Sequence, residues 1–285
     1  GDVYKRQHNR ERKQQRMSRI LLIGYQGFVG QAIRRKAPAS FQIEGVTSAD
    51  INQPTRAGFD LIINAGGKIW GDIKDVEYAL MSSAEITIRN ACQSQCPILH
   101  IGSSVEYGTR TESIFLKEEE DLQPQTNYAK AKVRSWNQIA SMAPQKAVSL
   151  RAGPILSRLV SPHSLLGKIR DMAFQENQVF PVSSSVLAIE RNPIHLDDFV
   201  SAVLEVSNHL LASHTSTVPS VLNCGGEEVI SICDLANQIL SLSSLPDRYP
   251  TPPYINHYEL IDTTRLKTST RWKPMRSIRN GDWLQ

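Results

Sequence analysis

The chain has 285 residues, of which 40% are hydrophobic and 21% charged, and four are cysteines. This length can bury a sizeable core, either as one large α/β domain or as a domain with a smaller lobe. Residues 1–16 ("GDVYKRQHNRERKQQR") carry six Lys or Arg against two acidic residues, so the remainder is balanced although the whole chain has a net charge of +4. A balanced body lacks the basic stripe of a nucleic-acid-binding surface, and no nucleic-acid partner is expected.

Residues 1–16 are polar and precede "MSRILLIG", which reads like a natural start. We expect a disordered or non-native leader there, with a basic targeting arm as the alternative. No run approaches about 18 consecutive apolar residues, so no membrane span is expected and the cytoplasm is the predicted compartment. The four cysteines do not form a disulfide scaffold. Cys92 and Cys96 lack a second Cys/His pair, so no metal site is predicted.

The first two-thirds of the chain alternates short apolar runs with amphipathic stretches. Strands separated by helices predict a parallel sheet covered on both faces, a Rossmann-type doubly wound α/β fold. The predicted strands are 19–24, 41–47, 60–66, 96–102 and 146–153, and the predicted helices are 28–36, 77–94 and 126–141.

The pattern loosens after residue 154. It predicts a loop and then a helix in 153–174, a helix starting near Asp197, a short strand in "VLNCGG", a helix in "ISICDLANQILSLS", and a loop in the Pro-rich 245–258. We therefore expect an α/β core over 17–153, completed by parts of 190–225. Residues 154–285 are expected to form mainly a smaller, C-terminal lobe.

Three glycines follow the first predicted strand and open the first predicted helix: Gly24, Gly27 and Gly30 in "ILLIGYQGFVGQAI". A backbone without side chains lets a pyrophosphate reach the amides of a helix N-terminus, where the macrodipole favours negative charge. A simple tight turn is the alternative. The strand before the glycines and the helix after them favour dinucleotide binding.

Two further stretches carry candidate chemistry. Ser103 and Ser104, in "ILHIGSSVEYG", lie just past a predicted strand, where ligands sit in open α/β sheets. A loop serine that caps the next element is the alternative. Tyr128 and Lys132, in "NYAKAK", are four residues apart, so on a helix they project from the same face.

In this order and spacing, the glycines, "NAGG", the Ser–Tyr–Lys set, "RNPIHLDDFVSAVL" and the tail "DTTRLKTSTRWKP" resemble the extended short-chain dehydrogenase/reductase family. The closer likeness is to its NAD-dependent epimerase/dehydratase type, which acts on nucleotide sugars, and it spans nearly everything from Met17 onward. "IGSSVEYG" is most similar to the 4-keto-sugar reductase branch.

The resemblance implies a catalytic set of Ser103, Tyr128 and Lys132. In reduction, Tyr128 would protonate the developing alkoxide while the Ser103 hydroxyl hydrogen-bonds it. A phenol titrates near pH 10, and we expect the Lys132 ammonium and the oxidised nicotinamide to lower that pKa. Lys132 would also hold the nicotinamide ribose hydroxyls.

The same resemblance implies a cofactor, NAD or NADP, bound by the core over 17–153, and a substrate-binding role for the lobe over 154–285. No acidic residue ends the second strand to bind a ribose 2′-hydroxyl, and no Arg stands there for a 2′-phosphate; the preference stays open, with a lean to NADP for a net reductase. The implied cofactor-binding residues are Gly24, Gln26, Gly27, Phe28, Val29, Gly30, Asp50, Ile51, Ala65, Gly66, Tyr128 and Lys132. Asp50 and Ile51 resemble the family's adenine-contacting pair.

Three departures and matches bear on the substrate. Ser104 and Val105 stand where sugar dehydratases carry Asp and Glu, so dehydration is disfavoured, and Glu106 is expected to point to the wrong side. Pro154 replaces an Asn that seats the family's substrate. Arg191 matches the family's diphosphate-contacting arginine, with a surface Arg as the alternative. Ser104 would be a substrate contact or a cap.

His195, Asp197 and Asp198 could suggest a metal or proton relay, but they lack zinc spacing. We expect an Asp to cap the following helix and His195 to pack between the lobes.

The predicted function is therefore an NAD(P)-dependent oxidoreductase of a nucleotide-activated sugar, by 4-keto reduction or C4 epimerisation. Alternatives are a reductase of a non-sugar carbonyl, such as a flavonoid- or polyketide-like ketone, and a non-catalytic dinucleotide-binding regulator. The resemblance also implies a homodimer through the helices at 77–94 and 126–141.

Overall fold

The protein is described by a computed structural model that covers residues 17–160, 164–212, 218–243, 245, 248–254 and 257–284. The leader predicted at residues 1–16 lies outside these ranges. Within them, no helix combines the length and the apolarity that crossing a bilayer requires.

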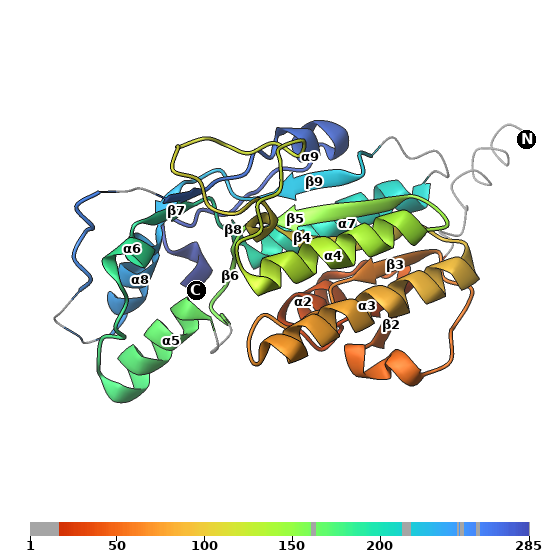
Figure 1. The fold of residues 1–285 in the computed structure, drawn as a ribbon, viewed down its shortest axis with the longest axis horizontal. Helices are drawn as coiled ribbons and strands as arrows, with labels where there is room; N and C mark the ends of the chain where they lie inside the picture. The colour runs from red at the N-terminus through yellow and green to blue at the C-terminus, as the bar shows by residue number, and fades with distance from the viewer. Residues whose placement is uncertain are drawn as a thin grey trace, which may run out of the picture.

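A six-stranded, fully parallel sheet forms the larger part of the molecule (Figure 1). Its order is β2-β1-β3-β4-β5-β9, so the chain reverses its direction of growth between β1 and β3. Ligands bind outside the carboxyl ends of strands at such a switch point. The strands are β1 (Ser18–Ile23), β2 (Phe41–Val46), β3 (Leu61–Asn64), β4 (Ile98–Ser103), β5 (Ala147–Ala152) and β9 (Val221–Cys224).

Helices cover both faces of this sheet. α2 (Phe28–Lys36) and α7 (Leu196–Ala212) lie on one face, and α3 (Ile73–Ser94) and α4 (Asn127–Met142) on the other (Figure 1). Alternate residues of β1 divide between the two cores: Leu22 packs in the cluster that contains Phe199 of α7, and Ile23 in the cluster that contains Trp136 of α4. The doubly wound fold predicted from the alternating pattern is confirmed.

The predicted helix boundaries hold at 28–36 and nearly so at 126–141, but α3 begins at Ile73, four residues before its prediction. The Asp72 side chain accepts a hydrogen bond from the Lys74 amide at 2.9 Å, which starts the helix at this earlier point. At α4 the Thr126 hydroxyl accepts from the Ala129 amide at 3.1 Å. Both helices are therefore capped by a side chain just before their first turn.

A smaller unit lies at the end toward which β5 and β9 point in Figure 1. It has its own apolar cluster, which includes Leu156, Ile169, Leu235 and Trp283. Its strands form a three-stranded sheet in the order β10-β7-β11 and a pair β6-β8. They are β6 (Ile155–Leu156), β7 (Ile189–Arg191), β8 (Ile194–His195), β10 (Ile230–Ser231) and β11 (His257–Glu259).

The remaining helical elements are short, apart from α8 (Ile232–Leu240). Both α8 and α5 (Leu165–Asp171) lie where the sequence pattern predicts a helix. The others are η1 (Ser48–Asn52), η2 (Ser104–Tyr107), η3 (Met172–Glu176), α6 (Ser184–Leu187), α9 (Thr264–Thr270) and η4 (Asp282–Leu284). The sequence pattern did not predict the strands of two or three residues in the smaller unit, and it placed His257 and Tyr258 in a loop. Strands this short carry no periodicity and form only through long-range pairing.

The helix predicted to start near Asp197 begins at Leu196, as expected, but its cap differs from the prediction. Neither Asp caps the helix; instead Nδ1 of His195, a buried side chain, accepts the Asp197 amide at 3.0 Å. Asp197 pairs with Lys36 and Arg276, each at 3.0 Å. Asp198 is buried, and its Oδ2 accepts the amides of Met275 at 3.0 Å and Arg276 at 2.8 Å. Asp198 thus fastens the C-terminal segment to α7.

Replacing Asp198 by Ala is expected to lower the free energy of unfolding by about 2 kcal/mol, because it leaves two amides without their charged acceptor. Urea unfolding measures this loss. Asp197→Ala is the matched control, since its ion pairs involve partly exposed side chains and should cost under about 1 kcal/mol. Equal losses in the two variants would contradict the fastening role of Asp198.

Candidate active site

The three predicted glycines form a tight turn between β1 and α2, and the turn touches the end of β3. Gly24 has φ +79°, and a Cβ there would lie 2.6 Å from the Ala65 carbonyl oxygen. A Cβ on Gly30 would lie 2.2 Å from the Gly24 carbonyl oxygen, whereas one on Gly27 would lie 3.2 Å from that atom. Gly24 and Gly30 are thus required for the close approach of the turn to Ala65 and Gly66 and for its own closure.

The N-terminus of α2 opens from this turn. Its cap residue is Gly27, no side chain caps it, and its first turn holds no acidic residue. The first amides of a helix have no partner within the helix, and the macrodipole adds positive charge there. A cradle without Cβ atoms beside uncapped amides fits a dinucleotide pyrophosphate.

The other predicted cofactor residues lie near the same carboxyl ends of the strands. Gln26 is exposed on the turn, while Phe28 and Val29 are half-buried in the first turn of α2. The Gly66 amide donates to Oδ1 of Asn64 at 3.0 Å, which shapes the chain after β3. Their contacts with a cofactor stay predictions.

Asp50 and Ile51 lie in η1, just after β2. The Asp50 carboxylate accepts the Thr47 amide at 2.7 Å and the Thr47 hydroxyl at 2.9 Å. These two hydrogen bonds hold the pKa of Asp50 below its ordinary value. The carboxylate therefore caps η1, and its place beside an adenine stays a prediction.

Ser103 is the last residue of β4 and is half-buried. Its Oγ accepts the Val105 amide at 3.5 Å, so the hydroxyl proton remains available for donation to another acceptor. Ser104 begins η2 and is buried, with 4% of its surface exposed. The structure gives Ser104 no contact that tests its predicted role toward substrate.

Tyr128 and Lys132 lie one turn apart near the start of α4. The Tyr128 ring is half-buried and packs against Val76 and Leu80 of α3. Lys132 is buried, and its Nζ donates to the Ile101 carbonyl at 2.7 Å. Since Ile101 precedes Ser103 by two residues in β4, this bond brings the lysine to the strand end that carries the serine.

Burial dominates the protonation of this pair. It lowers the pKa of Lys132 to about 8 and raises the pKa of Tyr128 above its ordinary value, and the Glu106 carboxylate acts on both in the upward direction. The lowering expected from Lys132 is therefore not found in the protein alone. The phenol is desolvated, and the ammonium is hydrogen-bonded to a backbone carbonyl.

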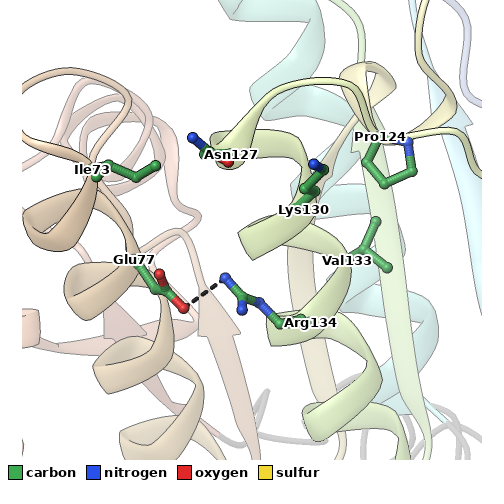
Figure 2. A pocket seen from close by; sticks show the side chains of 7 residues that line it. All are labelled: Ile73, Glu77, Pro124, Asn127, Lys130, Val133 and Arg134. Carbon is green, nitrogen blue, oxygen red and sulfur yellow. Dashed lines mark ion pairs between the residues drawn. The ribbon is translucent and has the colours of Figure 1, made fainter.

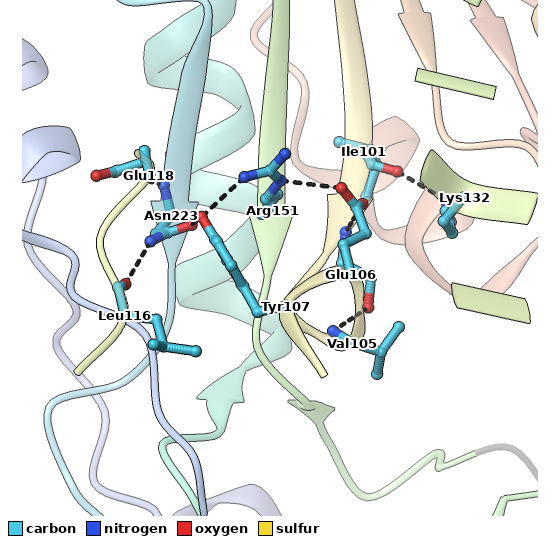
Figure 3. Close-up of polar contacts among 10 residues, drawn as sticks. Ile101, Val105, Glu106, Tyr107, Leu116, Glu118, Lys132, Arg151 and Asn223 are labelled. Atoms are coloured by element: carbon cyan, nitrogen blue, oxygen red, sulfur yellow. Dashed lines mark hydrogen bonds and ion pairs between the residues drawn. The ribbon is translucent and has the colours of Figure 1, made fainter. Parts of the chain in front are cut away.

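A buried polar network that the sequence interpretation did not identify joins β4, β5 and β9 beside Ser103 (Figure 3). Arg151 donates to Oε2 of Glu106 and to the Tyr107 hydroxyl, both at 2.9 Å. The Tyr107 hydroxyl donates in turn to Oδ1 of Asn223 at 2.8 Å. The backbone N–H of Asn223 donates to Oε1 of Glu118 at 2.9 Å. The network is a continuous chain of contacts from one edge strand to the centre of the sheet.

Glu106 also reaches Ser103, because its Oε1 accepts the Ser103 amide at 2.8 Å. The serine and the glutamate together form a capping box around η2. Ser-x-x-Glu is the known sequence signature of that motif, so the spacing of Ser103 and Glu106 could have revealed it. One oxygen of the Glu106 carboxylate binds Arg151, and the other accepts the Ser103 backbone amide.

Arg191 lies in β7, away from the glycine turn. Its Nε is 2.9 Å from Oε2 of Glu259 in β11, an ion pair without hydrogen-bond alignment. Pro154 accepts the Ile194 amide at 2.9 Å and so joins the paired strands β6 and β8. The roles of both positions toward a substrate stay predictions. Within the described ranges, no group of three potential metal ligands comes together.

A six-stranded parallel sheet, a glycine turn at its switch point and an uncapped helix N-terminus beside that turn define a Rossmann-type dinucleotide-binding protein. No family model matches the chain. It is 23% identical over 302 aligned residues to the dTDP-6-deoxy-L-talose 4-dehydrogenase (NAD(P)(+)) of Kitasatospora kifunensis, covering 93% of each protein. This match confirms the resemblance to the extended short-chain dehydrogenase/reductase family that the motifs indicate.

Solved structures share the fold at low sequence identity. MoeE5 in complex with UDP-glucose and NAD matches with a TM-score of 0.75 at 14% identity, over 94% of this chain and 97% of that one. A UDP-galactose 4-epimerase matches with a TM-score of 0.73 at 14% identity, over 93% of this chain and 97% of that one. A dTDP-4-dehydrorhamnose reductase from Clostridium acetobutylicum matches with a TM-score of 0.72 at 13% identity, over 93% of this chain and 98% of that one.

Proposed function

We propose that the protein is an NAD(P)-dependent oxidoreductase that reduces the 4-keto group of a nucleotide-activated sugar and catalyses the reverse oxidation. One observation carries the proposal: the Lys132–Ile101 hydrogen bond brings the helix with Tyr128 and Lys132 to the end of β4 that carries Ser103. The glycine turn lies at the same carboxyl ends of the parallel strands. The name of the curated relative, a nucleotide-sugar 4-dehydrogenase, supports this choice of substrate and position.

The residues present fit a nicotinamide dinucleotide. Gly24, Gly27 and Gly30 with the first amides of α2 would hold the pyrophosphate, and Lys132 would hold the nicotinamide ribose. When bound, the cofactor supplies or accepts a hydride. The curated relative is named for both NAD and NADP, and solved neighbours contain NAD. For a net reductase we propose NADP as the preferred cofactor.

The residues of the chain supply the proton chemistry. The Ser103 hydroxyl donates a hydrogen bond to the substrate carbonyl oxygen, which stabilises the negative charge that develops there. The Tyr128 hydroxyl gives its proton to the same oxygen. The Lys132 ammonium stabilises the phenolate that remains until solvent returns the proton.

Dehydration is disfavoured because positions 104 and 105 hold Ser and Val, which cannot serve as an acid–base pair. The neighbouring Glu106 carboxylate is held by Arg151 and by a backbone amide. C4 epimerisation remains a second candidate, since it uses the same three residues in two opposite half-reactions. An epimerase keeps its cofactor between them, so tightly bound NAD in the purified protein would favour it.

A panel of 4-keto and 4-hydroxy nucleotide sugars, each assayed with both cofactors through nicotinamide absorbance, tests the proposal. Turnover of external NADPH or NADH with a 4-keto nucleotide sugar is the expected result. Turnover only with ketones that lack a nucleotide would assign the protein to the reductases of non-sugar carbonyls. No turnover despite cofactor binding would favour a regulator.

The substrate-binding role of residues 154–285 belongs to the same proposal. Arg191 would bind the substrate diphosphate, with Glu259 orienting the guanidinium through its Nε and the terminal nitrogens binding phosphate oxygens. A cytoplasmic location is also proposed, in keeping with the supply of nucleotide sugars and nicotinamide cofactors there.

We further propose that the protein forms a homodimer through α3 and α4. These helices pack side by side and carry a surface depression of about 500 Å³ between their N-terminal halves, where Arg134 and Glu77 form an ion pair at 2.6 Å (Figure 2). Ile73 and Tyr78 of α3 are exposed by 45% and 60%. Exposed apolar side chains on a helix pair are typical of an interface.

Replacing Tyr78 by Glu is expected to raise the dimer dissociation constant at least about tenfold, because a charge would be buried against apolar surface. Light scattering after size-exclusion chromatography measures the molar mass over a range of concentrations. A wild-type protein that stays monomeric at high concentration would contradict the dimer, and Asn208→Glu on α7, an exposed position on the opposite face of the sheet, is the control.

A further inference from the structure

Glu106 is the most deeply buried carboxylate near the proposed site, with 0% of its surface exposed. Both of its oxygens are engaged: Oε1 accepts the Ser103 amide at 2.8 Å and Oε2 accepts Nε of Arg151 at 2.9 Å (Figure 3). A fully buried carboxylate carries a large desolvation cost, which only such specific partners offset. The ion pair with Arg151 would be enough for a purely structural carboxylate, so the additional hydrogen bond from the Ser103 amide points to a second role.

The surrounding backbone leaves space for this carboxylate. A Cβ on Gly102 would lie 3.0 Å from Oε1 of Glu106 and 2.6 Å from the Ser149 hydroxyl. Because Gly102 has no side chain, the Glu106 carboxylate can lie against β4 at this point. η2, which carries Glu106, packs in turn against α4, which carries Tyr128 and Lys132.

We propose that Glu106 is a positioning residue, which fixes the Ser103 backbone at the end of β4 and whose negative charge holds the Tyr128–Lys132 pair in its protonated form. This inference rests on the proposed function, because the protonated pair is the form that gives a proton in ketone reduction.

The electrostatics agree with the geometry. Burial lowers the pKa of Lys132 and the Glu106 carboxylate raises it, leaving a pKa of about 8. The same carboxylate adds to burial in raising the pKa of Tyr128, because it repels a phenolate. Loss of the Glu106 charge would therefore lower the pKa of both groups.

Other ionisable groups packed around α4 do not replace this charge. Arg151 of β5 acts on Tyr107 and His100 but is not among the causes that shift Tyr128 or Lys132. His100 of β4 is fully buried, and its pKa lies well below the ordinary value, so it is neutral. In α3, Asp75 pairs with Lys68 and Glu77 with Arg134, Arg89 donates to backbone carbonyls, and Lys74 and Glu85 are exposed.

The test is the pH dependence of kcat/KM for ketone reduction in the wild type and in Glu106→Gln. The amide keeps the shape and one acceptor oxygen but removes the charge. We expect the falling limb at high pH to move to lower pH by about one unit, so that kcat/KM drops about tenfold above the limb and much less below it. A uniform drop with an unmoved limb would show a structural role only and overturn the proposal.

Glu118→Gln is the matched control. Glu118 is another buried carboxylate of the network, bound to the Asn223 amide and 3.5 Å from Arg265, and its charge acts on Tyr107 rather than on Tyr128. The variant should leave the limb in place. A limb that moves equally in both variants would overturn the specific role of Glu106.

Two readouts separate this proposal from the proposed function. Absorbance titration of tyrosinate, with Tyr128→Phe subtracted, needs no substrate and should show Tyr128 ionising at lower pH in Glu106→Gln; an unchanged titration contradicts the inference whatever the reaction. If the variant does not fold, the wild-type profile still decides. A falling limb near or above pH 8 supports the role, and a limb below neutrality overturns it.

Discussion

Replacing Tyr128 by Phe is expected to lower kcat for ketone reduction by about a thousandfold, because the substrate oxygen loses its proton donor. The phenol lies one turn before Lys132 on α4, and no other tyrosine of the sequence has a lysine four residues on. Steady-state rates with the best substrate of the nucleotide-sugar panel measure the loss. The Ser103 hydrogen bond and substrate binding would sustain the residual rate.

In this variant the phenyl ring should still pack against Val76 and Leu80, so folding and cofactor affinity are expected to stay close to wild type. Fluorescence titration with NADPH and NADH checks the affinity. Tyr78→Phe is the control, since Tyr78 is exposed on α3 and has no place in the proposed chemistry. A Tyr128→Phe enzyme that keeps more than a tenth of the wild-type rate would rule out this tyrosine as the proton donor.

Replacing Gly30 by Ala is expected to weaken cofactor binding by about a hundredfold, which corresponds to about 2.7 kcal/mol. The added Cβ would lie 2.2 Å from the Gly24 carbonyl oxygen and 2.8 Å from the Tyr25 Cα, so the backbone of the glycine turn must move. The same movement should destabilise the fold by about 1–3 kcal/mol. Calorimetric titration with each cofactor and thermal unfolding measure the two effects.

Gly27→Ala serves as the control for stability. Its Cβ would lie 3.2 Å from the Gly24 carbonyl oxygen, which a small adjustment can accommodate. We expect it to unfold close to the wild-type temperature. A Gly30→Ala protein with unchanged affinity for both cofactors would mean that the turn does not hold a pyrophosphate.

The main sheet could be predicted because its strands are buried on both faces. Runs such as "ILLI" in β1 and "LIIN" in β3 are continuous in the sequence, and amphipathic helices separate them. The β7–β10 and β6–β8 pairings were missed, since they involve two or three residues each and join segments about forty residues apart. Their formation depends on the tertiary structure rather than on a local pattern.

The candidate site was predicted in part. The family resemblance indicated Ser103, Tyr128 and Lys132, and the structure brings Ser103 and Lys132 to the same end of β4. The network behind them was missed. Spacing shows that Glu106 follows Ser103 by three residues, but it does not show that a buried carboxylate meets an arginine 45 residues later. The lowering of the Tyr128 pKa expected from Lys132 and the oxidised nicotinamide is not found in the protein alone, where burial and the Glu106 carboxylate raise this pKa.

Isotope transfer tests the central claim most directly. NADPH or NADH carrying deuterium at the transferable position of the nicotinamide is supplied with a 4-keto nucleotide sugar, and the product is examined by mass spectrometry and NMR. Deuterium at C4 of the sugar, incorporated about a thousandfold more slowly in Tyr128→Phe because the oxygen loses its proton donor, is the result we predict. A cofactor that binds but delivers no deuterium to C4 of any 4-keto nucleotide sugar would contradict it.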